Sequence, residues 1–153
     1  MLIVAKDRSY DDLLRDVKGK KVRIWTCNTC ARLCYGLGGR DSAERLALKL
    51  REDRVDVSGV DSTSASCIES NLRKFAIPDD TALIVSLTCD LGAACARRIF
   101  QKEVLNPVRT FGPGLICEQC GPALVSVGPD GRITAKSLLE ICGTQSPDDM
   151  PFV

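Results

Sequence analysis

The sequence predicts an α/β protein: a small Rossmann-like or flavodoxin-like parallel sheet with a cysteine-bearing hairpin appended near its C-terminus. Three observations support this fold class. Short apolar runs alternate with segments of helical periodicity, which is typical of parallel strands joined by crossover helices. The run at 82–87 is continuously apolar, as in a central strand covered on both faces. Beyond Gly112 the pattern changes to a Cys-x-x-Cys pair followed by two short extended segments.

The 153 residues suit one domain with a real core. We expect residues 1–112 to form an α/β core with a cysteine-rich site at the strand ends. Residues 113–145 are expected to form the cysteine-bearing hairpin appendage, and residues 146–153 a tail.

The first elements follow from local signals. Ser9 is a good N-cap for a helix over 10–17, where apolar residues recur at helical spacing. A strand is expected at 21–25, ending on Cys27. The segment Gly36-Leu37-Gly38-Gly39 then turns the chain into a second helix.

That second helix has an Asp-x-x-Glu variant of the capping box, made by Asp41 and Glu44. Its expected buried stripe consists of Ala43, Leu46, Ala47 and Leu50. A short β-branched strand is expected at 54–60. A Ser/Thr loop then leads to Cys67 and to a helix that carries Ile68, Leu72 and Phe75.

The segment Pro78-Asp79-Asp80 breaks the chain before the central strand, which ends at Cys89. Gly92 is expected to precede a helix that runs through Phe100. A shorter extended piece is expected at 108–111.

The last part of the chain has the signature of a small hairpin. Segments 124–127 and 132–134 are expected to be its strands, and Gly128-Pro129-Asp130-Gly131 its turn. A brief helix is expected from Ser137 to Cys142.

Charge and hydropathy exclude several classes of protein. Lys and Arg number 21 against 20 acidic residues, so no broad basic footprint for nucleic acid is present. No apolar stretch approaches the roughly 20 residues of a membrane span. The N-terminal residues lack the apolar centre and cleavage site of a signal peptide. We therefore expect a cytoplasmic protein that binds neither nucleic acid nor a membrane.

Nine cysteines and no histidine restrict the chemistry of any site. An odd number of cysteines without an export signal favours free thiols over a disulfide framework. The lack of histidine removes imidazole ligation, Cys-His nucleophilic pairs and the usual acid–base residue. A bound metal must therefore rely mainly on sulfur, which suits zinc, copper(I) or an iron–sulfur cluster.

The most informative motif is the triplet Cys27, Cys30 and Cys34, which follows an apolar strand and precedes a glycine-rich turn. Two thiolates separated by two residues can bind one metal while the backbone turns beneath them, and the third arrives about one helical turn later. Cys67 and Cys89 also follow predicted strands, and the carboxyl ends of parallel strands share one edge of a sheet. We expect Cys27 and Cys30 to bind the metal, with Cys34, Cys67 and Cys89 competing for the remaining positions.

Cys117 and Cys120 form a weaker pair, which we expect to build a second metal site together with Cys142. The fourth ligand of that site would come from the cysteines at the carboxyl edge of the sheet, which we call the rim. Alternatively, the site has three thiolate ligands and one open position. Cys95 lies in an Ala-rich helical run, and we assign it to packing.

The chain resembles a known family through these motifs. They are the run 20–39 with its three cysteines, the strand end at Cys89 with Gly92 three residues on, and Asn106-Pro107-Val108 with Phe111-Gly112. They continue with Cys117-x-x-Cys120-Gly121 and with Ala135-Lys136-Ser137-Leu138-Leu139 before Cys142-Gly143. Together they resemble the small subunit, or C-terminal cysteine-rich domain, of acetogen-type methylenetetrahydrofolate reductase. Ala123 and the segment 131–134 stand where that family usually has further cysteines.

This resemblance implies an iron–sulfur or zinc-binding subunit that partners a flavin-containing reductase. The leading hypothesis is an iron–sulfur electron-transfer subunit, with a cluster expected to be 4Fe-4S, that acts as an accessory subunit of an oxidoreductase and not as the catalyst. The alternative is a zinc-binding structural or assembly module without redox activity. A third hypothesis is a thiol–disulfide enzyme that uses Cys27/Cys30 or Cys117/Cys120.

Overall fold

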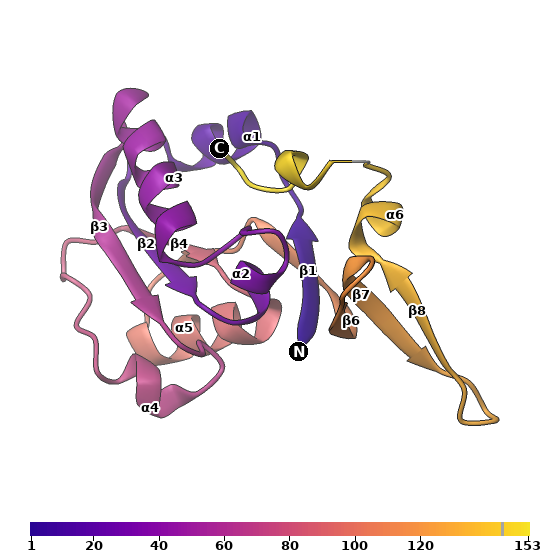
Figure 1. The fold of residues 1–153 in the computed structure, drawn as a ribbon. Coiled ribbons are helices and arrows are strands. Elements are labelled where there is room, and N and C mark those ends of the chain that lie inside the picture. The colour runs from indigo at the N-terminus through magenta and orange to yellow at the C-terminus, as the bar shows by residue number, and fades with distance from the viewer. Residues whose placement is uncertain (145) are drawn as a thin grey trace.

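The computed structural model describes residues 1–144 and 146–153. It is an α/β protein in which a four-stranded parallel sheet packs with helices and a separate antiparallel sheet lies beside it (Figure 1). In sheet order, the parallel strands are β3 (Asp56–Thr63), β2 (Lys21–Cys27), β4 (Leu83–Leu87) and β5 (Val104–Leu105). The antiparallel strands are β1 (Leu2–Lys6), β6 (Val108–Cys117), β7 (Gly121–Val127) and β8 (Ile133–Ser137).

Helices cover both faces of the parallel sheet. The helices are α1 (Tyr10–Val17), α2 (Cys30–Leu33), α3 (Arg40–Glu52), α4 (Glu69–Leu72), α5 (Asp90–Phe100), α6 (Leu138–Cys142) and the 3₁₀ helix η1 (Pro147–Asp149). Figure 1 shows α3 on one side of the sheet and α4 with α5 on the other. The core is accordingly split into two hydrophobic clusters, a larger one that includes the buried residues of α1 and α3 and a smaller one that includes those of α4 and α5.

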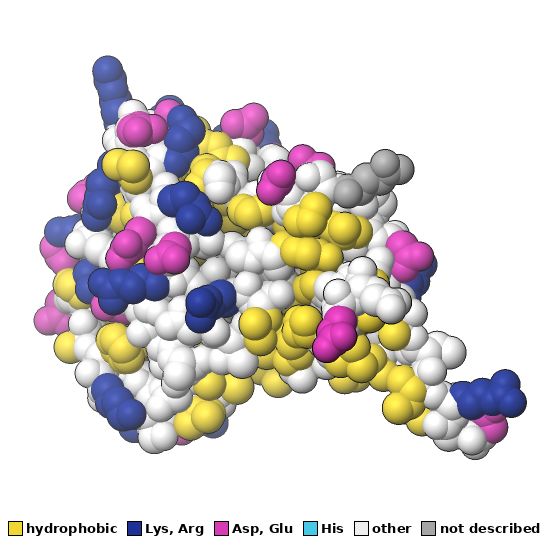
Figure 2. All heavy atoms as spheres, viewed as in Figure 1, with side chains coloured by type: hydrophobic (Ala, Val, Ile, Leu, Met, Phe, Trp, Pro, Cys, Tyr) yellow, Lys and Arg dark blue, Asp and Glu magenta, His cyan; other side chains and the backbone are white. Residues whose placement is uncertain are grey.

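Trp25 organises the smaller cluster. Its ring centroid lies 5.0 Å from that of Phe75 and 5.0 Å from that of Phe100, both in edge-on geometry. All five residues of β4 are buried, which confirms the expected central strand. Figure 2 shows hydrophobic side chains in a band between the parallel-sheet half of this face and the β7–β8 hairpin.

The first helix begins as expected, because the Ser9 side chain accepts a hydrogen bond from the Asp12 amide. The predicted capping box of Asp41 and Glu44 is wrong. Helix α3 begins two residues earlier, with Gly39 instead of Asp41 as its N-cap residue, and it has no side-chain hydrogen bond from that residue.

Side chains at and just after the end of β2 accept the hydrogen bonds at the start of α3 that a capping box would accept. The Gly39 amide donates to Thr26 Oγ1 at 2.8 Å, and the Arg40 amide donates to Asn28 Oδ1 at 3.2 Å. Because tertiary partners already satisfy these amide groups, the helix needs no local capping residue.

Helix α5 also starts earlier than expected, and Gly92 lies inside its first turn. A Cβ on Gly92 would lie 2.9 Å from the Thr88 side chain and 3.0 Å from Ser66 Cβ. The missing side chain therefore lets α5 approach the loop that follows β3.

The C-terminal part contains the expected hairpin of β7 and β8 and the expected helix α6. Strand β6 is longer than the predicted 108–111 because it pairs with both β1 and β7. It runs through residue 112, so the predicted boundary between core and appendage falls within a strand, and the division into domains stays a prediction. In the segment expected to be a tail, Met150 and Phe152 are buried in the larger cluster.

None of the helices within the described residues is long and apolar enough to cross a membrane.

Candidate metal centre

The carboxyl ends of three parallel strands meet at one rim. Strand β2 lies between β3 and β4, with Cys27 opposite Thr63 and Thr26 opposite Leu87. Adjacent strands are about 4.8 Å apart. Because β2 and β4 are neighbours in this sheet, the chain segments that carry Cys27 and Cys89 leave the sheet side by side.

Cys27 and Cys30 stand at the turn from β2 into α2. Cys27 is 6% exposed, and its Sγ lies 3.5 Å from the Ser64 carbonyl oxygen. Cys30 is half-buried and accepts a hydrogen bond from the Leu2 amide at 3.4 Å. The Thr29 hydroxyl donates to the Ser64 carbonyl and ties this turn to the loop after β3.

Cys67 is exposed on that loop, and a buried chain of hydrogen bonds fixes its neighbour Ser66. Trp25 Nε1 donates to Ser66 Oγ at 2.7 Å, and Ser66 Oγ donates to the Gly92 carbonyl at 3.1 Å. This chain links β2, the loop and α5, so Cys67 is held close to the start of the helix that Cys89 precedes.

Cys89 is 6% exposed and is the N-cap residue of α5. Burial raises its pKa above the ordinary value and the hydrogen bond from the Gly92 amide lowers it in part, while negative charge on Cys30, Cys67 and Cys27 makes smaller contributions that raise it. The three thiols are therefore close enough to Cys89 for their charges to act on it.

Cys34 faces β1 instead. It is fully buried, and its Sγ lies 3.5 Å from the Val4 amide nitrogen, which donates to it. Burial raises the pKa of this thiol to about 11, with smaller contributions from charge on Cys30 and Cys142. Of the three residues expected to compete for the remaining positions, Cys67 and Cys89 are therefore better placed than Cys34.

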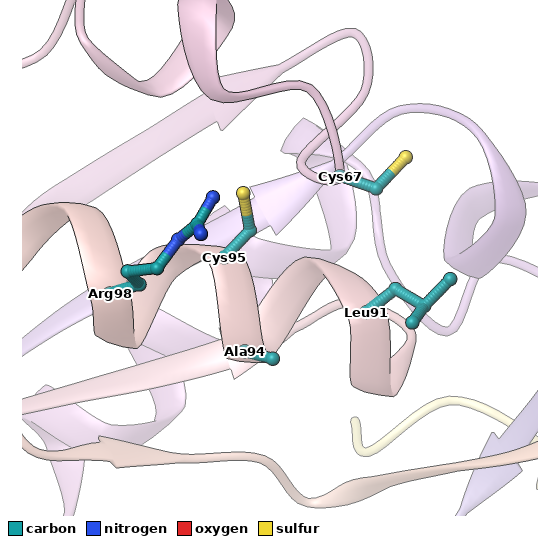
Figure 3. Close-up of a pocket in the computed structure, with 5 residues that line it drawn as sticks. All are labelled: Cys67, Leu91, Ala94, Cys95 and Arg98. Atoms are coloured by element: carbon teal, nitrogen blue, oxygen red, sulfur yellow. The ribbon is translucent and has the colours of Figure 1, made fainter.

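Cys67 also lines a shallow pocket with Leu91, Ala94, Cys95 and Arg98 (Figure 3). Cys95 is half-buried and packs against the smaller hydrophobic cluster, in line with its assignment to packing. Burial is the main cause that raises its pKa, and charge on Cys67 adds to it. In Figure 3 the Cys67 sulfur points away from Cys95.

The expected second group consists of a pair on one turn and of Cys142 at the end of α6. Cys117 and Cys120 lie together on the turn between β6 and β7, where the Cys120 amide donates to Cys117 Sγ at 3.4 Å. Hydrogen bonds from Cys120 and from the Gln119 amide lower the pKa of Cys117, whereas sharing this bond raises that of Cys120. Burial raises the pKa of Cys142. A shared site of Cys117, Cys120 and Cys142 stays a prediction.

Within residues 1–144 and 146–153, no three cysteine or acidic side chains converge closely enough to hold a single metal ion. Tetrahedral zinc with bonds of about 2.3 Å would need thiolates about 3.8 Å apart. Cys27, Cys30, Cys67 and Cys89, the four rim cysteines, therefore do not form a ready-made zinc site in this structure.

Sequence reasoning missed two residues of this region. Ser66 precedes Cys67 in a Ser/Thr loop, and nothing local marks it as the partner of Trp25. Tyr35 lies between two cysteine groups: its hydroxyl donates to the Cys120 carbonyl at 3.4 Å, and charge on Cys120 and Cys34 adds to burial in raising its pKa.

Comparisons with protein-family models, with curated proteins and with solved structures found no match for this chain.

Proposed function

We propose that this chain binds an iron–sulfur cluster through Cys27, Cys30, Cys67 and Cys89 and serves as an electron-transfer subunit. The observation that carries the proposal is the gathering of these four thiols at the carboxyl ends of β2, β3 and β4. An all-sulfur donor set with no histidine in the chain is the set that iron–sulfur clusters use.

A cluster and a single zinc ion need different arrangements of thiolates. A four-iron cluster places its thiolates on separate iron corners, further apart than the ligands of one tetrahedral ion. Among the described residues, no three cysteine or acidic side chains converge as the ligands of one ion must. Zinc bound by the same thiolates, as in a structural or assembly module, is the alternative that metal analysis separates.

The surroundings would hold such a group in a fixed place. When bound, the cluster supplies one-electron transfer. The Leu2 amide donates to Cys30 and the Gly92 amide to Cys89, and hydrogen bonds to ligand sulfur raise the reduction potential of a centre of this kind. Cys27 and Cys89 are buried whereas Cys67 is exposed, so the centre would lie close to the surface that a redox partner contacts.

The proposal extends to fold family, compartment and partner. The order of the parallel strands, second–first–third–fourth along the chain, supports a flavodoxin-like arrangement, which binds ligands at the carboxyl ends of its strands. All nine cysteines are free, which supports a reducing compartment such as the cytoplasm. The partner we propose is a flavin-containing methylenetetrahydrofolate reductase-like enzyme or another redox protein.

Anaerobic purification followed by iron, sulfide and zinc analysis tests this function. We expect brown protein with iron and acid-labile sulfide in equal amounts, and bleaching of the colour when the protein is reduced. Colourless protein with stoichiometric zinc would instead support the structural module.

A second assay tests the accessory role. The isolated chain should not reduce methylenetetrahydrofolate with any donor, because it offers no histidine as an acid or base. Turnover by the purified chain without a flavoprotein would contradict the subunit assignment.

A further inference from the structure

The turn between β6 and β7 holds two thiols side by side. Cys117 pairs with Gly121 across the hairpin, and the Cys120 amide donates to Cys117 Sγ. The first and last residues of a β-turn have Cα atoms less than about 7 Å apart, which overlaps the range of about 4.4–6.8 Å found in disulfides. A bond between these sulfurs therefore requires little movement of the backbone.

Contacts with Tyr35 also hold this turn in place. Gly121 has φ +70°, and a Cβ there would lie 2.4 Å from Tyr35 Oη, so only glycine fits. The Tyr35 hydroxyl donates to the Cys120 carbonyl. The two sulfurs thus sit on a supported turn, and both are partly exposed to solvent.

A metal is a poorer use of this pair. Zinc in a structural site needs four ligands, and across the described parts of the chain no third cysteine or acidic side chain joins the two thiols at metal-binding distance. Cys142, the nearest candidate by sequence, lines a different pocket with Ala5 and Lys6 of β1.

We propose that Cys117 and Cys120 form a reversible dithiol–disulfide pair that exchanges with small or protein disulfides, separately from the rim cysteines. The Cys117 thiolate attacks one sulfur of a disulfide such as oxidised glutathione, which breaks the S–S bond and releases one glutathione thiolate. Cys120 then attacks Cys117 Sγ, its proton passes to the departing second glutathione, and the internal disulfide forms. In balance, the two cysteines lose two electrons and two protons, and one oxidised glutathione becomes two reduced molecules.

Mass spectrometry of the full chain tests this proposal. The anaerobically purified protein is equilibrated in buffers of increasing oxidised-to-reduced glutathione ratio, its free thiols are alkylated, and its peptides are mapped. We expect the peptide that contains residues 117–120 to lose two hydrogen atoms and to escape alkylation. Cys120→Ser should abolish the internal disulfide and accumulate glutathione on Cys117, while Cys142→Ser should leave the disulfide unchanged.

Two results would overturn the proposal that Cys117 and Cys120 form a reversible disulfide. One is a pair that stays reduced and is alkylated at every glutathione ratio. The other is loss of bound zinc or iron from Cys117→Ser, which would make the pair a metal ligand. The iron content of the same samples is measured separately and tests the proposed function. If the rim cysteines bind no iron, the glutathione result for Cys117 and Cys120 is unaffected.

Discussion

The hydrogen bond between Trp25 and Ser66 is expected to stabilise the fold and to position the loop of Cys67. Trp25 is fully buried and Ser66 is 1% exposed, and the Nε1–Oγ distance is 2.7 Å. An indole N–H can only donate, so Ser66→Ala leaves a buried donor without a partner. Such a group costs about 1–3 kcal/mol. A loss of about 2 kcal/mol lowers the melting temperature of a chain of this size by roughly 4–8 °C.

Urea unfolding followed by far-UV circular dichroism measures this cost. Trp25 is the only tryptophan, so its fluorescence reports the same transition locally. Ser70→Ala is the matched control because Ser70 is exposed on α4, and its cost should stay within about 0.5 kcal/mol.

A double-mutant cycle assigns the effect to the hydrogen bond. Phe has no N–H, so in the Trp25→Phe background Ser66→Ala should cost at least about 1 kcal/mol less than in the natural sequence. Equal costs in both backgrounds, or a cost of Ser66→Ala below about 0.5 kcal/mol, would refute the reasoning.

Two further predictions concern packing and pH. Gly38→Ala should destabilise the protein by about 1–3 kcal/mol in urea unfolding, because the new Cβ would lie 2.7 Å from both Ala31 Cβ and the Leu87 carbonyl oxygen. An unchanged midpoint of the urea transition would show that the β2–α3 connection is less tightly packed than described. In metal-free protein, the Cys34 pKa of about 11 lies above its ordinary value of 9.0, so the folded chain retains a proton that the unfolded chain loses. The contribution of the neutral Cys34 thiol to the free energy of unfolding, about 2–3 kcal/mol, should be complete below pH 9 and lost as the pH rises toward 11. The free energy of unfolding of Cys34→Ala should therefore fall less steeply over that pH range. Equal slopes of the free energy of unfolding against pH for the natural chain and Cys34→Ala would contradict this prediction.

Local signals in the sequence predicted the elements that depend on local physics. The N-cap at Ser9 and the continuous apolar run of β4 both formed as expected. The alternation of strands and helices predicted parallel strands, and their shared carboxyl edge predicted that Cys27 and Cys89 lie at the same edge of the sheet.

Elements that depend on distant partners were not predictable. Strand β1 pairs with β6, more than a hundred residues further on, and β5 has only two residues. The capping box at Asp41 fails because Thr26 and Asn28 take over its role. Similarly, the position of Cys34 against β1 depends on a strand that the sequence did not reveal.

The most direct test of the central claim is the iron content of single Cys→Ser variants after anaerobic reconstitution with iron and sulfide. The natural chain should hold about four iron atoms. Each rim variant, at Cys27, Cys30, Cys67 or Cys89, should lose most of that iron and its visible absorption, whereas Cys95→Ser should retain both. Full iron in Cys67→Ser and Cys89→Ser would contradict a centre built from the ends of three strands.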